Sequence, residues 1–192
     1  FTLHLITQNS GQAVSNSPIE KIEILSNGSR KVSFQETPPM STYLLAFLVG
    51  DFDKKSYDAN DIQLNIWTTP DVLDQLDFAG DVAAKSLEFL KNTFNIKYPL
   101  VKLDICGIPN FEKSGMENFG IIFLKENNLL IDFESSQFSK EEVAETIVHE
   151  IAHQWFGNLV GVKSWDELWL KEAFATWFSW YAIDELFPNW KI

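Results

Sequence analysis

The chain has 192 residues, of which 45% are hydrophobic and 14% aromatic, enough for the packed core of one ordinary domain or two small ones. Its formal net charge of −12 argues against a nucleic-acid partner, because proteins bind phosphate backbones through clustered Lys and Arg. Cys106 is the single cysteine, and neither a signal peptide nor an apolar run of roughly eighteen residues is present, which excludes an internal disulfide and predicts a globular, cytoplasmic protein without a membrane segment.

Residues 1–69 have the sequence features of strands and turns. Asn27-Gly28, a pair typical of hairpin turns, lies between two apolar stretches, and a clean alternation of apolar and polar residues ends at Thr68-Thr69-Pro70. We predict strands at 1–7, 22–25, 31–34, 43–49 and 62–67, and a hairpin turn in the charged residues 51–61. His4 is interpreted as an ordinary strand residue. The domain boundary is placed at residue 69.

From Pro70 the pattern changes to helix, because apolar residues recur at intervals of three and four between Val72 and Leu90. Further strands are predicted at 102–106, 121–124 and 129–131, with a loop at 108–118. Cys106 is interpreted as a small core residue rather than a nucleophile. The chain is therefore predicted to be α+β, with a β-rich domain over 1–69 and a second domain over 70–192.

A second helix is predicted between Ser139, which can cap the first turn together with Glu142, and Gly157, which can end it. At 100° per residue, the apolar residues of this segment gather on one side and the acidic residues and histidines on the other. His149 and His153 are four residues apart, so they lie on one face of the helix. A single tetrahedral ion could take a nitrogen from each.

Glu150 completes the pattern His-Glu-x-x-His, which on a helix indicates a zinc site. Its side chain points roughly 60° round the helix from His153, too far aside for an obvious third ligand but near enough to reach a metal-bound water, as a general base must. The alternative is the solvated face of an ordinary amphipathic helix. Because the chain has only three histidines, a chance match is expected on the order of a few times per thousand such chains, which favours the metal site.

Glu172 is the predicted third ligand. It lies in residues 168–183, which are apolar nearly all round and are predicted to form a buried helix after a second cap at Ser164 with Glu167. A buried carboxylate is costly unless it is paired or binds a metal, and a bound zinc ion removes that penalty. The alternative is a buried pair between Glu172 and Lys171.

The spacing of His-Glu-x-x-His, eighteen residues and Glu is that of the gluzincin metallopeptidases. Upstream, Gly115-Met116-Glu117-Asn118 resembles the Gly-Ala-Met-Glu-Asn exopeptidase motif of the aminopeptidase N and puromycin-sensitive aminopeptidase family. The resemblance also runs through residues 37–47, 49–52, 97–100 and 165–170, and so covers nearly the whole chain. It implies the end of a β-rich N-terminal domain followed by the first part of a thermolysin-like zinc metallopeptidase domain.

This resemblance implies one zinc ion per chain, bound by His149, His153 and Glu172, with Glu150 as the catalytic base. It also implies an oxyanion-stabilising tyrosine, which would fall beyond Ile192. Because the chain does not begin with Met and ends directly after a long helix, we expect a fragment of a larger protein that is nearly inactive by itself.

The resemblance also implies the substrate, a peptide with a free N terminus. In the family, the motif glutamate, here Glu117, binds the α-amine of the substrate. The backbone of the motif, here with Gly115, Met116 and Asn118, pairs with the peptide as an additional strand. Without the resemblance, Glu117 would be interpreted as one exposed loop carboxylate among many.

Four positions depart from the family pattern. Ser114 and Gly115 stand where the family has Gly and Ala, Lys171 replaces the Asn that commonly precedes the third ligand, and Ala173 replaces the following Gly. A cation next to a buried ligand could compete for Glu172. Two other hypotheses therefore remain beside an aminopeptidase: a weak or inactive family member that binds peptide or nascent-chain N termini, and a thermolysin-like endopeptidase.

Overall fold

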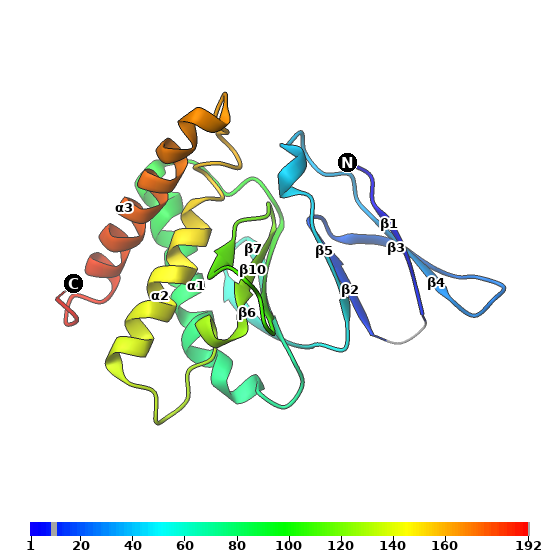
Figure 1. The fold of residues 1–192 in the computed structure, drawn as a ribbon, viewed down its shortest axis with the longest axis horizontal. Coiled ribbons are helices and arrows are strands. Elements are labelled where there is room, and N and C mark those ends of the chain that lie inside the picture. Colours follow the sequence, from blue (N-terminus) through cyan, green and yellow to red (C-terminus); the bar gives the residue numbers. More distant parts are fainter. Residues whose placement is uncertain (9–10, 192) are drawn as a thin grey trace.

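The computed structural model of the protein describes residues 1–8 and 11–191 (Figure 1). Strands dominate the first part of the chain and helices the last, so the predicted α+β class is confirmed. The strands are β1 (His4–Thr7), β2 (Gln12–Ser15), β3 (Ile19–Ile24), β4 (Arg30–Phe34), β5 (Phe47–Gly50), β6 (Asp53–Ala59), β7 (Ile62–Thr68), β8 (Lys102–Ile108), β9 (Gly115–Met116) and β10 (Ile121–Lys125). The helices are α1 (Asp77–Phe94), α2 (Gln137–Ala152) and α3 (Leu168–Leu186).

The first five strands form two small antiparallel sheets, with the orders β1-β4-β3 and β2-β5. Gly28 has a φ of +82° in the turn between β3 and β4, a left-handed conformation that glycine adopts without strain. The predicted Asn27-Gly28 hairpin is therefore confirmed. The strand predicted at 43–49 begins only at Phe47, because the preceding residues Thr42–Leu44 form a 3₁₀ helix.

β6 to β10 build a five-stranded mixed sheet in the order β6-β7-β8-β10-β9. The charged residues 51–61, predicted as a hairpin turn, mostly form β6, and the turn itself is confined to Asn60 and Asp61. β7 and β8 are parallel neighbours, and α1 crosses between them. The boundary predicted at residue 69 thus separates two paired strands. Strand pairing groups residues 53–68 with the second half of the chain, because the change from strand pattern to helix pattern at Pro70 marks a crossover within one sheet.

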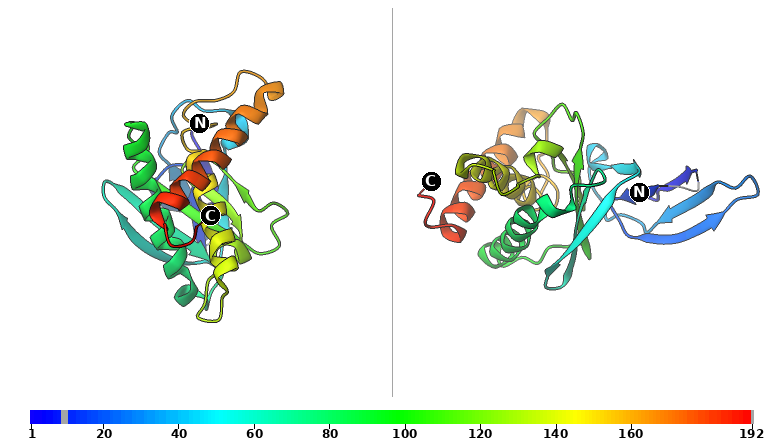
Figure 2. Two further views of the ribbon diagram at one scale, coloured as in Figure 1. Left: turned by 90° about the vertical axis from the view of Figure 1, so that its left-hand side faces the viewer. Right: turned by 90° about the horizontal axis from the view of Figure 1, so that it is seen from below.

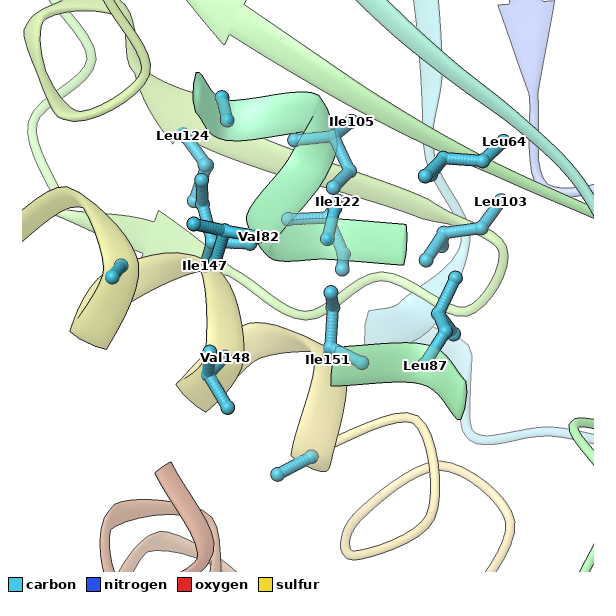
Figure 3. Close-up of a cluster of buried hydrophobic side chains, with 14 of the residues drawn as sticks. Leu64, Val82, Leu87, Leu103, Ile105, Ile122, Leu124, Ile147, Val148 and Ile151 are labelled. Atoms are coloured by element: carbon cyan, nitrogen blue, oxygen red, sulfur yellow. The ribbon is translucent and has the colours of Figure 1, made fainter. Parts of the chain in front are cut away.

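The helices lie on one face of this sheet and the small sheet β2-β5 on the other (Figures 1 and 2). Successive residues of a strand point to opposite faces, so Leu103 and Ile105 of β8 join the helix-side core, whereas Cys106 packs with Val14 and Leu48. Figure 3 shows the helix-side core, in which aliphatic side chains from the sheet, α1 and α2 meet. Cys106 is buried, as predicted for a core residue.

Both ends of α2 differ from the prediction. Its N-cap is Ser136, whose hydroxyl accepts a hydrogen bond from the backbone N–H of Ser139 (3.1 Å), so the predicted cap at Ser139 is wrong. The helix ends at Ala152 instead of continuing to Gly157, because the N–H groups of Gln154 and Trp155 bond to carbonyls three residues back in a tighter turn. His153 therefore occupies the C-cap position.

Two further predictions are wrong. Residues 129–131 are not a strand: they follow the 3₁₀ helix Glu126–Asn128, and the N–H of Ile131 donates to the carbonyl of Gln75. α3 is not buried all round. Its inner face carries Lys171 and Ala175, but Trp169 on its outer face is 65% exposed.

In the part of the chain that the structure describes, none of the helices combines the length and the apolar character needed to cross a membrane.

Lys102 joins the two halves of the molecule. Its buried ammonium group donates to the backbone oxygens of Ser15 (2.7 Å) and Gly120 (2.8 Å) and to the carboxylate of Asp104 (2.5 Å). Asp104 in turn accepts hydrogen bonds from the side chains of Asn65 and Trp67, both at 2.8 Å. This buried network connects β2 to the central sheet and so holds the N-terminal strands against the part of the molecule that carries the histidines.

Candidate metal centre and its cavity

α2 and α3 bring His149, His153 and Glu172 together. The Nε2 atoms of the two histidines are 3.0 Å apart, because residues four apart on a helix stack on one face. Glu172 reaches over from α3, with Oε2 3.5 Å from Nε2 of His149 and 3.3 Å from Nε2 of His153. The structure therefore assembles the three residues that were predicted as metal ligands.

These distances match the size of a zinc site. Zinc binds imidazole nitrogen and carboxylate oxygen at about 2.0–2.2 Å, so the corners of a tetrahedral site are roughly 3.3–3.5 Å apart. The three observed separations, 3.0, 3.3 and 3.5 Å, lie close to that value. Two imidazoles and one carboxylate also leave the fourth position open, as in hydrolytic zinc sites rather than structural ones.

Hydrogen bonds on the far side of each ring orient the histidines. Nδ1 of His153 lies 2.8 Å from the backbone oxygen of Phe156, which can only accept, so Nδ1 carries a proton and the neutral imidazole has its lone pair on Nε2. Nδ1 of His149 lies 3.4 Å from the hydroxyl of Thr176. The tight turn after Ala152 therefore orients His153, because it brings the carbonyl of Phe156 within hydrogen-bond distance of Nδ1.

Glu150 is buried beside the histidines, and the edge strand β9 covers it. A Cβ added to Gly115 would lie 2.2 Å from Oε1 of Glu150, so the absence of a side chain there makes room for this carboxylate. Oε2 of Glu150 accepts no hydrogen bond from any residue that the structure describes. Burial raises the pKa of Glu150 to about 8.

Glu117 is buried too, contrary to the exposed loop position that its sequence surroundings alone suggest. Its carboxylate accepts a hydrogen bond from the ammonium group of Lys171, which also donates to Oε1 of Glu172 at 2.8 Å. Its backbone oxygen accepts from the side-chain amides of Gln154 (3.1 Å) and Asn158 (2.6 Å). Glu117 is therefore anchored at both its backbone and its side chain.

The acidic and cationic groups perturb one another. Hydrogen bonds with His149 and His153 hold the pKa of Glu172 well below its usual range. Burial by itself lowers the pKa of Lys171, but its hydrogen bonds with Glu117 and Glu172 outweigh burial and raise that pKa to about 12. The predicted alternative of a Lys171–Glu172 pair is thus present together with the ligand geometry and does not replace it.

A cavity of about 360 Å³ opens onto this centre. Among the residues that line it are the three candidate ligands, the carboxylates Glu117 and Glu150, and Gly115 and Met116 of β9. β9 is the last strand of the sheet order, so an edge of the sheet borders the cavity. Asn118 is not one of the lining residues, since its amide instead donates to the backbone oxygen of Tyr43 at 3.3 Å.

Several residues around the centre escape the sequence patterns. Gln154, Asn158 and Thr176 contact Glu117 or His149, yet none belongs to a spacing motif. For Gln154 and Asn158 the one available signal is polarity at positions that prove buried, because buried amides in native proteins are generally hydrogen-bonded. Which partner each of them binds depends on packing between segments that are far apart in the sequence.

Comparison with known proteins gives two family matches that together cover most of the chain. Residues 78–192 match the Peptidase family M1 domain, and residues 1–44 match the Peptidase M1 N-terminal domain. Neither match includes residues 45–77, the segment that contains β5, β6 and β7.

Individual relatives are similar along nearly the whole chain. Aminopeptidase 2 of Candida albicans is 42% identical over 193 aligned residues, which cover 100% of this chain and 21% of the relative. Aminopeptidase M1 of Arabidopsis thaliana is 46% identical, covering 94% and 21%, and Probable aminopeptidase 1 of Saccharolobus solfataricus is 43% identical, covering 99% and 24%. The chain thus spans between about a fifth and a quarter of the length of these relatives.

Proposed function

Because this chain belongs to the M1 family of peptidases, we propose that it supplies the metal-binding and N-terminus-binding residues of a zinc-dependent aminopeptidase. The observation that carries this proposal is the meeting of two helix-borne histidines and three buried or half-buried carboxylates at one cavity beside a sheet edge. The names of the three relatives support aminopeptidase activity over an endopeptidase.

Zinc bound by His149, His153 and Glu172 would polarise the scissile carbonyl and lower the pKa of a water molecule. Glu150 would take a proton from a water molecule in this cavity, with Oε2 as the accepting atom because this oxygen has no partner among the described residues. The same carboxyl group then returns the proton to the leaving amine, acting as base and acid in turn. The carbonyl of Phe156 keeps the imidazole of His153 aligned during these steps.

Glu117 gives the site its exopeptidase character in this proposal. Its carboxylate faces the same cavity as Glu150, so it can accept hydrogen bonds from the free α-ammonium of a peptide whose first peptide bond lies beside Glu150. β9, at the open edge of the sheet, is the expected partner for the extended backbone of the substrate. The side-chain amide of Asn118 donates to the backbone oxygen of Tyr43 and so helps to hold the segment after β9 in place.

The test uses the full-length protein and two aminoacyl reporters that differ only in a free or an N-acetylated amine, each with and without a metal chelator. We expect turnover of the free-amine reporter alone, its loss on chelation and its recovery when zinc is restored. Equal cleavage of both reporters would refute the exopeptidase assignment. Zinc and peptide binding without turnover would instead indicate an inactive, peptide-binding family member.

A further inference from the structure

Lys171 forms a buried ion pair with the carboxylate proposed to recognise the substrate. The side chains of Lys171 and Glu117 are 5% and 8% exposed, and their contact joins α3 to the segment after β9 across 54 residues of sequence. The same ammonium group lies 2.8 Å from Oε1 of Glu172, whose other oxygen faces the two histidines. One cation thus bridges the amine-recognition carboxylate and the proposed zinc ligand.

The surroundings of Lys171 are built to hold it there. Gly157 has a φ of +117°, and a Cβ at this position would lie 3.0 Å from Cδ of Lys171, so glycine leaves room for the lysine stem. The ammonium group lies 5.6 Å from the centre of the Tyr43 ring, within the range of a cation–π contact. Three segments therefore enclose this cation, and it is not a surface lysine that folds back by chance.

The charge balance of the cavity follows from this contact. Glu117 alone would offer a full negative charge to an arriving ammonium group. Paired with Lys171, it offers a neutral pair, one oxygen of which is already engaged by a cation. A second ammonium group at the same carboxylate also comes close to the first, and like charges at such short range repel.

We propose that Lys171 is a built-in counter-ion of Glu117 that weakens binding of the substrate's free amino group, which makes it a positioning and specificity-determining residue of this site. The proposal rests on the proposed function, because it takes Glu117 as the amine-binding group. It predicts that this protein discriminates less between charged and uncharged N termini than it would if Glu117 had no lysine partner.

The test measures binding, in the full-length protein carrying Glu150→Gln so that peptide is not consumed. Calorimetry gives the Kd of one tripeptide with a free and with an N-acetylated N terminus, before and after the additional change Lys171→Asn. We expect the Kd of the free peptide to fall roughly tenfold, the size of one released charge-assisted hydrogen bond, with no change for the acetylated peptide. In the catalytically active protein, which keeps Glu150, Lys171→Asn should lower KM for the free-amine reporter more than it changes kcat.

Four controls separate this effect from others. Lys140→Asn removes the same charge near the start of α2, away from the cavity, and should leave both Kd values unchanged. In a Glu117→Gln background, Lys171→Asn should no longer tighten the free peptide, because the lysine acts through that carboxylate. Zinc content is measured throughout, and Lys171→Gln, which keeps a longer hydrogen-bonding side chain, repeats the comparison.

An unchanged or larger Kd for the free peptide in both Lys171 variants, with zinc bound, would overturn the proposal. Loss of zinc from both variants would also overturn it, since Lys171 would then serve to hold Glu172 in place. Failure of the proposed function has a different signature: the unmodified protein would lack zinc, or would cleave free and acetylated reporters equally.

Discussion

Three buried or half-buried carboxylates line one cavity, yet each has its own set of neighbours. Glu172 faces the histidines, Glu117 faces a lysine, and one oxygen of Glu150 is left without a partner among the described residues. A carboxylate that is buried and unpaired holds its proton more tightly than one beside a cation. These neighbours, more than the residue type, separate the three proposed roles of metal ligand, amine acceptor and base.

The ligand and base roles predict unequal effects of substitution. His149→Ala or Glu172→Ala should lose zinc, because each removes one of the three donor atoms. Glu150→Gln should retain zinc but lose turnover by roughly 10²- to 10⁴-fold, the usual contribution of a general acid–base group. Elemental analysis together with reporter turnover of the full-length protein checks both. Full activity in Glu150→Gln would exclude it as the base.

Glu117→Gln tests amine recognition. The amide keeps the size of the side chain but removes its charge, so kcat/KM for free-amine reporters should fall by roughly 10- to 100-fold with zinc still bound. The matched control is Glu145→Gln, which also lines the cavity but lies on the exposed side of α2. If the two variants lose the same small amount of activity, Glu117 has no special role.

Among the elements, α2 shows which features of a helix can be predicted from the spacing of apolar residues. Its existence and its apolar face were predicted from spacing, and Val148 and Ile151 are buried as that spacing requires. Its ends were placed wrongly, because Ser136 and Ser139 both have a serine hydroxyl that could cap, and only the tertiary path of the preceding chain selects Ser136. The outer face of α3 was predicted buried because its sequence is apolar, but apolar sequence does not say which partner covers it.

β8 is the element on which the helix-side core depends. Ile105→Ala removes buried methyl groups between the sheet and the helices and should lower the free energy of unfolding by about 2–5 kcal/mol. Ile24→Ala, on a β3 position that is 64% exposed, should change it by less than about 0.5 kcal/mol. Urea titration of the full-length protein measures both. Similar midpoints for the two variants would contradict this account of the core.

Lys102 connects β2 to the central sheet and so links the N-terminal strands to the rest of the molecule. Lys102→Met leaves Asp104 buried without its cation and should cost about 3–5 kcal/mol of stability. Adding Asp104→Asn should recover part of that loss, since it removes the uncompensated charge but keeps an oxygen for Asn65 and Trp67. Thermal unfolding of the single and double variants provides the comparison. No recovery in the double variant would show that the lysine acts through Ser15 and Gly120 instead.

The sequence by itself determined the residues whose relation is local or periodic. Because His149 and His153 are four residues apart on a helix, they lie on one face whatever the rest of the chain does. The spacing from these histidines to Glu172 carried the family resemblance. The alternation of residues 62–67 likewise predicted the strand that forms β7. These relations can be predicted because helices and strands allow few local backbone conformations.

Only the tertiary structure decided the contacts between distant segments. The pairing of β7 with β8 places residues 62–68 in one sheet with the later strands, the ion pair with Lys171 offsets the charge of Glu117, and Glu117 is buried instead of exposed. Each depends on how two elements pack, and a given apolar or charged residue is compatible with many such packings. The sequence therefore supplied the residues on which the proposed chemistry depends, and the fold set the electrostatic environment of those residues.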